Sequence, residues 1–425
     1  MQVIENLKVK EKVYIEKLEN GLTVKVIPKE GIQKKYMIWG TKYGSNESTF
    51  VVPGEEEVTT VPNGVAHFLE HKLFEQENGT NSLDVLTALG VEANAYTTND
   101  HTAYLFECTD NFYEAMNELM DYVQHPYFTD ENVEKEKGII GQEIMMYDDY
   151  PEWRVYLNAM KAMYHNNPVK IDIVGTIETI SKIDKDILYK CYNTFYNPSN
   201  MTLVLCGDFK PEEIIEEVKN RLIDNKASGE IKRIYPEEPE KIVKEKIEQK
   251  LEVSQPLYAI GIKDIVKCDL DKSDIVRKHI AIEILLNLLI GRSSNLYKEL
   301  YNEGIIYSQP SLEYEFTNIY AHVLITGQSN NPETVYEKFK QEVQKMKAGI
   351  NKEDFERIKK MIYGGYVKEY NDVADIARMF LADSFKGINS FDYLEEIEGI
   401  TVEYLEQILK DVFKEEKMII SVVNN

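Results

Sequence analysis

The sequence predicts an α+β protein made of two similar α/β domains in tandem, each a mostly antiparallel sheet packed by helices. Three observations lead to this prediction. In the first half of the chain, segments with strand-like alternation of apolar and polar residues are followed by helical stretches. The second half replays this order more weakly, with a period of roughly 210–220 residues. Between the two copies, the segment from Lys226 to Lys250 is polar, charged and interrupted by Pro236 and Pro239, which is typical of a linker.

The first half is expected to begin with two sheet strands, in "GLTVKVIPKEG" at 21–31 and "KKYMIWGTKYGS" at 34–45. A helix containing "HFLEH" at 67–71 follows an irregular acidic loop, and Asn63 is a suitable N-cap for it. The later elements are predicted, in order, as a helix at 82–89, a strand pair at 91–108, a long helical stretch from Asn111 to Met163 and a buried strand at 200–209.

The second half repeats several of these segments. "QPLYAIGIKD" at 255–264 is similar to the second strand of the first half, and "EKMIISVVNN" at 416–425 to its last strand. We therefore divide the chain into an N-terminal domain (1–228), a linker (229–250) and a C-terminal domain (251–425). In this alignment apolar residues or glycine replace the polar residues of the first copy: Ala281, Ile284 and Leu285 for His67, Glu70 and His71, and Gly365 for Glu143.

The composition of the chain indicates which classes of binding partner to exclude and in which cellular compartment to expect the protein. The net charge of −24 and the pI of about 4.9 argue against binding to nucleic acid or to an anionic membrane. The N-terminus has no apolar core of signal-peptide length, and no apolar run is long enough to span a bilayer. Cys108, Cys191, Cys206 and Cys268 are far apart and form no CxxC pair. They are expected to be free thiols, so we expect a cytoplasmic protein.

The segment "HFLEH" is the first candidate for chemistry. On a helix His67, Glu70 and His71 lie on one face, because residues three and four apart are neighbours. Two imidazoles one turn apart can bind one metal ion, and zinc is expected because it is commonly held by two histidines and a carboxylate. An adjacent carboxylate can then accept a proton from water activated by the metal. The alternative is two unrelated histidines on an ordinary helix.

A third protein ligand is needed, and residues 131–143 offer several carboxylates. Glu136 and Glu143 are seven positions apart, hence on one helix face two turns apart. Gly138 and Gly141 lie between them and are expected to permit close approach of another backbone, such as that of the metal helix. The alternative is a solvated acidic face, to which Glu131 and Glu134 would also belong. Spacing alone does not choose Glu143 over Glu136.

Together these motifs resemble the pitrilysin/insulinase family of zinc peptidases. The pattern H-x-x-E-H, which defines the inverzincins, is followed here by "EKGIIGQE" at 136–143, similar to the family's E-x6-E. "GTIETI" at 175–180 and "FYNPSNMTLVLCGDF" at 195–209 also resemble family segments. The similarity covers nearly the whole chain. It is closest to the short two-domain form that includes mitochondrial processing peptidase β subunits and bacterial homologues.

The resemblance implies a role for each of these residues. His67, His71 and Glu143 resemble the zinc ligands, with one zinc ion per chain, because only the first copy of the repeat keeps them. Glu70 resembles the general base, and Glu136 the carboxylate that supports a ligand. Residues 92–104 resemble the family's edge strand, against which a peptide substrate pairs as an added strand. The expected substrate contacts in it are Asn94, Ala95 and Tyr96.

We therefore expect a zinc endopeptidase that hydrolyses short or unfolded peptides inside a chamber formed by two two-domain chains. The alternatives are a non-catalytic structural or peptide-binding subunit of a paired complex, and a maturation protease of a peptide modification or export pathway. In active family members a domain without zinc commonly contributes an arginine and a tyrosine that hold the substrate. Between Arg292 and Arg357 this chain has no arginine. The expected partner is a related zinc-less subunit, giving a heterodimer, and otherwise a second copy of the chain.

Overall fold

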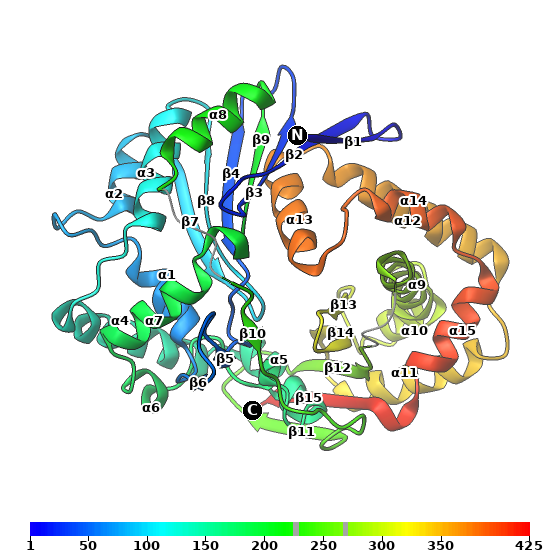
Figure 1. Cartoon of the computed structure of the whole chain (residues 1–425). Coiled ribbons are helices and arrows are strands. Elements are labelled where there is room, and N and C mark those ends of the chain that lie inside the picture. The colour runs from blue at the N-terminus through cyan, green and yellow to red at the C-terminus, as the bar shows by residue number, and fades with distance from the viewer. Residues whose placement is uncertain (224–228, 267–270) are drawn as a thin grey trace. The chain divides into compact units, whose positions relative to one another are not determined.

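The computed structural model describes residues 1–223, 229–266 and 271–425 (Figure 1). The predicted domain boundary at residue 228 and Cys268 lie outside these residues. The chain forms two compact units, each built from three stretches of sequence. The first consists of Met1–Ile144, Asp172–Ile234 and Lys368–Ser390, and the second of Met145–Ile171, Tyr235–Val367 and Phe391–Asn425.

The first unit contains a seven-stranded sheet in the order β1-β2-β3-β9-β4-β8-β7. Strands β3 and β9 are parallel, and the other neighbouring pairs are antiparallel. Every residue of β9 is buried, as expected for the apolar closing strand. The strands are β1 (Gln2–Asn6), β2 (Glu11–Lys17), β3 (Thr23–Pro28), β4 (Lys35–Thr41), β7 (Glu92–Thr97), β8 (Thr102–Cys108) and β9 (Met201–Gly207).

The helical stretch expected from Asn111 to Met163 is broken into three helices. Pro126 and Pro151 fall at the two breaks, because proline lacks a backbone N–H and disfavours helical geometry in the residue before it. The helices are α3 (Phe112–Gln124), α4 (Asp130–Asp148) and α5 (Pro151–Met163). The other helices of the first unit are α1 (Val65–Lys72), α2 (Ser82–Ala88), α6 (Ile177–Ile180), α7 (Lys185–Phe195), α8 (Pro211–Arg221) and α13 (Val373–Lys386), and a small sheet joins β5 (Thr49–Val51), β6 (Val58–Thr60) and β10 (Lys232–Arg233).

The second unit repeats the architecture of the first. Its sheet has the order β11-β15-β12-β14-β13, which matches β3-β9-β4-β8-β7 in both order and strand direction. The predicted pair of similar α/β domains with mostly antiparallel sheets is therefore confirmed. The elements are β11 (Lys246–Lys250), β12 (Leu257–Asp264), β13 (Ser311–Phe316), β14 (Ala321–Gln328), β15 (Met418–Asn424), α9 (Lys272–Ile290), α10 (Asn295–Asn302), α11 (Pro332–Met346), α12 (Lys352–Glu369), α14 (Asp392–Gly399) and α15 (Val402–Val412).

The two halves of the chain exchange one helix each. Helix α13, from the second half, packs on β4 and β9 of the first unit (Figure 1), and α5, from the first half, packs on β12 and β15 of the second. Equivalent glycines make room for both helices. A Cβ on Gly40 would lie 2.9 Å from Leu381, and one on Gly261 would lie 2.9 Å from the sulfur of Met163. The domains predicted from the sequence are continuous stretches and describe the two copies of the repeat. The compact units differ from them, because each combines three separate stretches of the chain.

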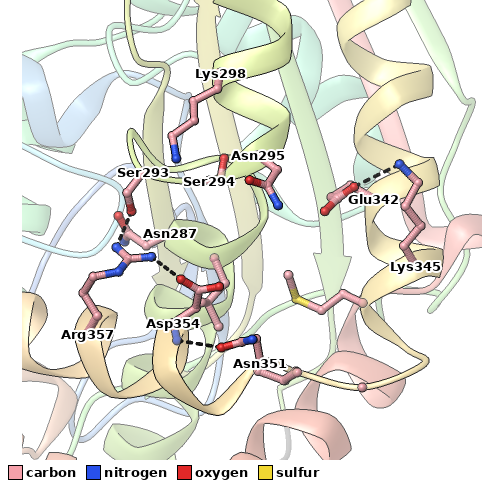
Figure 2. A pocket seen from close by; sticks show the side chains of 14 residues that line it. Asn287, Ser293, Ser294, Asn295, Lys298, Glu342, Lys345, Asn351, Asp354 and Arg357 are labelled. Carbon is pink, nitrogen blue, oxygen red and sulfur yellow. Dashed lines mark hydrogen bonds and ion pairs between the residues drawn. The ribbon is translucent and has the colours of Figure 1, made fainter.

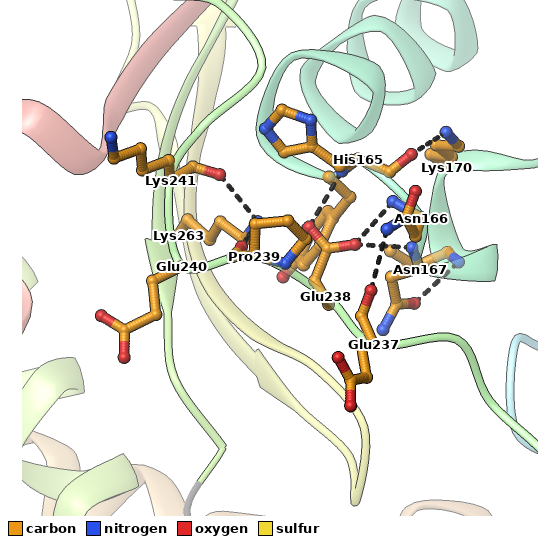
Figure 3. Close-up of polar contacts among 12 residues, drawn as sticks. His165, Asn166, Asn167, Lys170, Glu237, Glu238, Pro239, Glu240, Lys241 and Lys263 are labelled. Carbon is orange, nitrogen blue, oxygen red and sulfur yellow. Dashed lines mark hydrogen bonds and ion pairs between the residues drawn. The ribbon is translucent and has the colours of Figure 1, made fainter.

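Part of the predicted linker is fixed to the second unit (Figure 3). The Glu238 carboxylate accepts hydrogen bonds from the backbone N–H groups of three successive residues, His165, Asn166 and Asn167, at 2.9, 2.6 and 2.7 Å. It also pairs with the ammonium group of Lys263, which is only 3% exposed. Downstream, residues 246–250 form β11. This segment is therefore not a free solvated linker.

Two expectations from composition can be compared with the described residues. Cys108, Cys191 and Cys206 are buried free thiols, as predicted. Within the described ranges, no helix has both the length and the apolar character needed to cross a membrane.

Candidate metal centre

Helix α1 presents His67, Glu70 and His71 within a buried segment. It begins after Gly64, which adopts a left-handed conformation with φ of 97° and makes no side-chain cap. A Cβ at this position would lie 2.8 Å from the carbonyl oxygen of Val174, so only glycine fits the turn. The expected N-cap, Asn63, is therefore wrong by one residue, because the local backbone needs positive φ more than it needs a capping side chain.

Helix α4 supplies the carboxylates that face these histidines. The Oε2 atom of Glu143 lies 3.5 Å from Nε2 of His67 and 3.5 Å from Nε2 of His71. One ligand atom from each residue lies within 4.8 Å of the others, and this is the only such group of histidine, cysteine and acidic residues among the described parts of the chain. The spacing of seven residues brings Glu136 to the same region, where its Oε1 atom lies 3.0 Å from Nδ1 of His71.

The group has the donor set and the atomic environment of a zinc site. Two imidazole nitrogens and one carboxylate oxygen are the ligands found in many zinc hydrolases, which leave a fourth position open. Oε2 of Glu143 is buried without a hydrogen-bond partner, which would be costly unless a cation is bound there. The Nδ1–H of His71 can donate to Glu136, the arrangement that usually orients a metal-bound histidine. Nδ1 of His67 is buried and has no such partner.

The electrostatics keep the carboxylates ionised. Burial raises the pKa of Glu136, but hydrogen bonding to His71 and the charges of His71 and Lys72 outweigh it, so the net pKa is below its ordinary value. The pKa of Glu143 is also lowered, since the contacts with His67 and His71 outweigh burial. For His71, burial lowers the pKa, but the three neighbouring glutamates raise it more. Because several carboxylates surround the histidines, the site favours binding of a dication, which would replace the protons on the histidines.

The remaining member of the group, Glu70 of α1, is hydrogen-bonded by a residue of strand β7. The hydroxyl of Thr97 donates a 2.6 Å hydrogen bond to Oε2 of Glu70, whose residue is 9% exposed. Strand β7 is at the edge of the sheet and, within the described part of the chain, pairs with β8 alone. Because side chains alternate along a strand, Ala95 lies on the Thr97 face, and Asn94 and Tyr96 lie on the other. Tyr96 accordingly contacts His101, with 3.3 Å between its hydroxyl and Nε2.

The structure changes a second expectation, on Gly138 and Gly141, and adds two residues to the site. Among the residues that the structure describes, none comes within 4 Å of a Cβ on Gly138, and a Cβ on Gly141 would meet the side chain of Ile177 alone, at 3.4 Å. The expected close backbone approach at these glycines is therefore wrong, because α4 contacts α1 through side chains. Thr97 and Lys72 were not predicted. Thr97 could have been predicted from strand alternation, which places it on the same face as Ala95. Nothing in the sequence around Lys72 indicated that this lysine would be buried.

The second unit has apolar residues in place of this group. Ala281, Ile284 and Leu285 are fully buried in α9, as expected for core positions. A cavity of about 510 Å³ in this unit is polar and holds no histidine or cysteine among its lining residues (Figure 2). In it, Arg357 donates hydrogen bonds of 2.6 Å to Ser293 and to Asp354.

Comparisons with known proteins identify the family to which this chain belongs. The chain is 39% identical to the uncharacterized zinc protease YmfH of Bacillus subtilis (strain 168) over 412 residues, which is 96% of this chain and 95% of that protein. The model for insulinase, peptidase family M16, matches residues 54–177. The chain belongs to the insulinase family, peptidase family M16. The resemblance stated from the sequence is thereby confirmed.

Other matches extend over nearly the whole chain. The family's model for an inactive domain matches residues 182–362. A crystal structure of an M16-like peptidase from Alicyclobacillus acidocaldarius has a TM-score of 0.93 and 33% identity, and the match covers 99% of this chain and 100% of that chain. Mitochondrial-processing peptidase subunit beta of Dictyostelium discoideum is 23% identical over 439 residues, 96% of this chain and 88% of that protein. These names support a peptidase of the zinc-dependent class.

Proposed function

We propose that the chain is a zinc-dependent endopeptidase that hydrolyses short or unfolded peptides inside a chamber formed by two two-domain chains. The observation that supports this most directly is the convergence of His67, His71 and Glu143, with Glu70 held beside them by Thr97. A subunit kept only for structure would have no need of a buried carboxylate oxygen that faces two histidines without a hydrogen-bond partner.

In the proposed site His67, His71 and Glu143 hold the zinc ion, one per chain. When bound, the ion supplies Lewis acidity at the scissile carbonyl and at water. Glu70 accepts a proton from the attacking water and returns it to the leaving amine. Thr97 keeps the Glu70 carboxylate in place by its 2.6 Å hydrogen bond. Glu136 accepts from Nδ1–H of His71 and so fixes the orientation of that ring.

The substrate is proposed to bind at the free edge of β7. A peptide in extended form can add to an edge strand by main-chain hydrogen bonds, which select for unfolded chain rather than for sequence. Asn94, Ala95 and Tyr96 would contact it, with Ala95 on the face shared with Thr97 and the other two on the opposite face. A folded protein keeps most of its strands paired within its own sheets, so an unfolded peptide is the better partner for this edge.

Two relatives support a paired assembly. One protein in the comparison is named subunit beta of mitochondrial-processing peptidase. A structure of Complex III2 from Candida albicans has the same fold, with a TM-score of 0.74 at 14% identity. We infer that this chain also pairs, with a related zinc-less subunit, and that it acts in the cytoplasm.

Replacing the general base tests the proposal. Glu70→Gln should retain about one zinc per chain, because Glu70 is not a ligand, yet lose peptide hydrolysis by about 10²–10⁴-fold. His71→Ala is the matched control that should lose the metal instead. Zinc content by atomic absorption and turnover of an unfolded peptide give both readouts. Unchanged turnover by Glu70→Gln would exclude its role. Wild-type protein that binds zinc but cleaves no peptide in any pairing would favour the non-catalytic subunit.

A further inference from the structure

The last residue of α1, Lys72, is fully buried beside the candidate metal centre and has no role in the proposed mechanism. Its side chain is 0% exposed. Burying an ammonium group is costly unless it is paired, and an apolar side chain of similar length would fill the same space without that cost. A charge retained at this position therefore calls for an explanation from its contacts.

Two carboxylates surround the Lys72 ammonium group. It pairs with Glu75, whose side chain is 33% exposed, and lies 3.7 Å from Oε2 of Glu136. The other oxygen of Glu136, Oε1, lies 3.0 Å from Nδ1 of His71. The two oxygens of Glu136 are thus divided, one facing the lysine and the other the histidine. Rotation of this carboxylate away from His71 would also remove it from Lys72.

Charge balance acts through the same carboxylate, because the charge of Lys72 offsets that of Glu136. Glu70, Glu136 and Glu143 bring three negative charges to the buried region, and a bound dication and Lys72 bring three positive charges. In the low-dielectric surroundings such a balance strengthens each contact and leaves no net charge to be solvated. The more exposed Glu75 is screened by solvent.

We propose that Lys72 is a positioning residue for the metal centre: it holds the Glu136 carboxylate in the orientation that accepts from His71, and thereby sets the metal affinity. This inference rests on the proposed zinc site but not on peptidase activity. Lys72 acts through Glu136 and His71, without touching metal or substrate.

Zinc affinity of the purified full chain, measured by competition with a chromophoric chelator, tests the inference. Lys72→Met keeps the length and apolar stem of the side chain and should weaken zinc binding about tenfold, within the 10–100-fold range typical when a residue behind a metal ligand is lost. Glu136→Gln should weaken it by a similar or larger factor. In the double variant the loss should not exceed that of Glu136→Gln alone, because Lys72 acts through Glu136. Glu75→Gln is the matched control and should bind zinc as the wild type does.

The outcomes separate this inference from the proposed function. Wild-type affinity in Lys72→Met, or fully additive losses in the double variant, would overturn the role of Lys72 while leaving the zinc site intact. If Lys72→Met does not fold, Lys72→Gln, which keeps a donor but not the charge, should show the same weakening, and unchanged affinity there would overturn the role equally. Failure of the wild type to bind zinc would overturn both proposals.

Discussion

Thr97 connects the strand proposed to bind substrate with the residue proposed to move the proton. Its hydroxyl donates to Glu70 and lies 3.3 Å from the hydroxyl of Thr102 on β8. The rigid sheet therefore fixes the position of the Glu70 carboxylate. A catalytic base that is held in this way needs no reorganisation when substrate binds.

Removing this hydroxyl should impair turnover and leave the metal in place. A hydrogen bond to a charged group contributes about 1.5–3 kcal/mol, so Thr97→Val should lower kcat by about 10–100-fold. Thr97→Ser keeps the hydroxyl and should retain most of the activity. Zinc content and peptide kinetics of the two variants make the comparison. Equal kcat values for the valine and serine variants would show that Glu70 does not depend on Thr97.

His322 gives the second unit an acid-sensitive core position. It is 1% exposed, and Nδ1 lies 3.1 Å from the hydroxyl of Tyr164. Burial lowers the pKa of His322 to about 3, against a smaller raising effect of the Asp264 charge. The unfolded chain takes up a proton below pH about 6.5, whereas the folded chain does not until pH about 3. The folded state therefore loses stability as the pH falls through this window.

Between pH 7 and pH 5 the titration of His322 lowers the free energy of unfolding by about 2 kcal/mol. His322→Gln should show that much less acid destabilisation than the wild type over the same interval. His125→Gln, at a side chain that is 57% exposed, is the control and should follow the wild type. Urea unfolding monitored by Trp153 fluorescence in a Trp39→Phe background reports on the second unit. The same acid dependence in His322→Gln and wild type would contradict the prediction.

At the scale of elements, the Glu238 carboxylate makes several of the contacts that hold the segment after β10 in the second unit, beside backbone contacts at Glu237, Pro239 and Lys241. Glu238 accepts three backbone hydrogen bonds and pairs with buried Lys263 (Figure 3). Removing one partner of a buried ion pair leaves the other charge uncompensated. Burial raises the pKa of Glu238, but Lys263 and the three N–H groups lower it more, so the carboxylate is ionised at neutral pH.

Glu238→Gln should therefore destabilise the second unit by about 3 kcal/mol, at the lower end for a buried pair, because the amide can still accept some of the hydrogen bonds. Glu240 lies two residues away with a side chain that is 70% exposed, and Glu240→Gln should change stability by less than about 0.5 kcal/mol. Urea unfolding followed by Trp153 compares them. Similar midpoints for the two variants would refute the anchoring role.

Sequence patterns predicted the elements better than their connections. The HxxEH spacing and the seven-residue step from Glu136 to Glu143 are local helix geometry, so they indicated which side chains share a face. Strand alternation predicted β7 and β8 in the same way. The exchange of α5 and α13 depends on packing at Gly40 and Gly261, which only tertiary contacts reveal. Lys72 was missed because its burial beside Glu136 depends on a contact between α1 and α4 that the sequence does not show.

At the scale of the whole molecule, two copies of one architecture carry different chemistry. The sheets share strand order and direction, and each is covered by a helix from the other half of the chain. Among the described residues, only the first keeps the polar residues on α1, the first helix after β4, which is equivalent to α9 after β12. In the second, α9 has core residues at those positions. The duplicated fold therefore supplies one proposed site per chain.

The last prediction concerns what completes that site. Strands β13 and β14, equivalent to β7 and β8, contain no arginine. Tyr314 of β13 donates a 2.7 Å hydrogen bond to Asp264, and Tyr320, which directly precedes β14, donates to Glu315, so both tyrosines are engaged inside the unit. Both are buried, at 8% and 2% exposure. A second copy of this chain would therefore offer no free arginine–tyrosine pair from these strands to hold a substrate.

We accordingly expect the productive assembly to be a heterodimer with a related zinc-less subunit that bears such a pair. The purified chain alone should be inactive or weak towards unfolded peptides even when fully loaded with zinc, because a lone site lacks the wall that encloses substrate and excludes bulk water. Light scattering and peptide cleavage, with and without the second subunit, make the test. Adding that subunit should raise kcat/KM by orders of magnitude, and replacing its arginine by alanine should abolish the gain. Full activity from a homodimer freed of every co-purifying protein would refute the prediction and assign substrate holding to residues of this chain, of which Arg378, on α13 beside Tyr36, is the first to test.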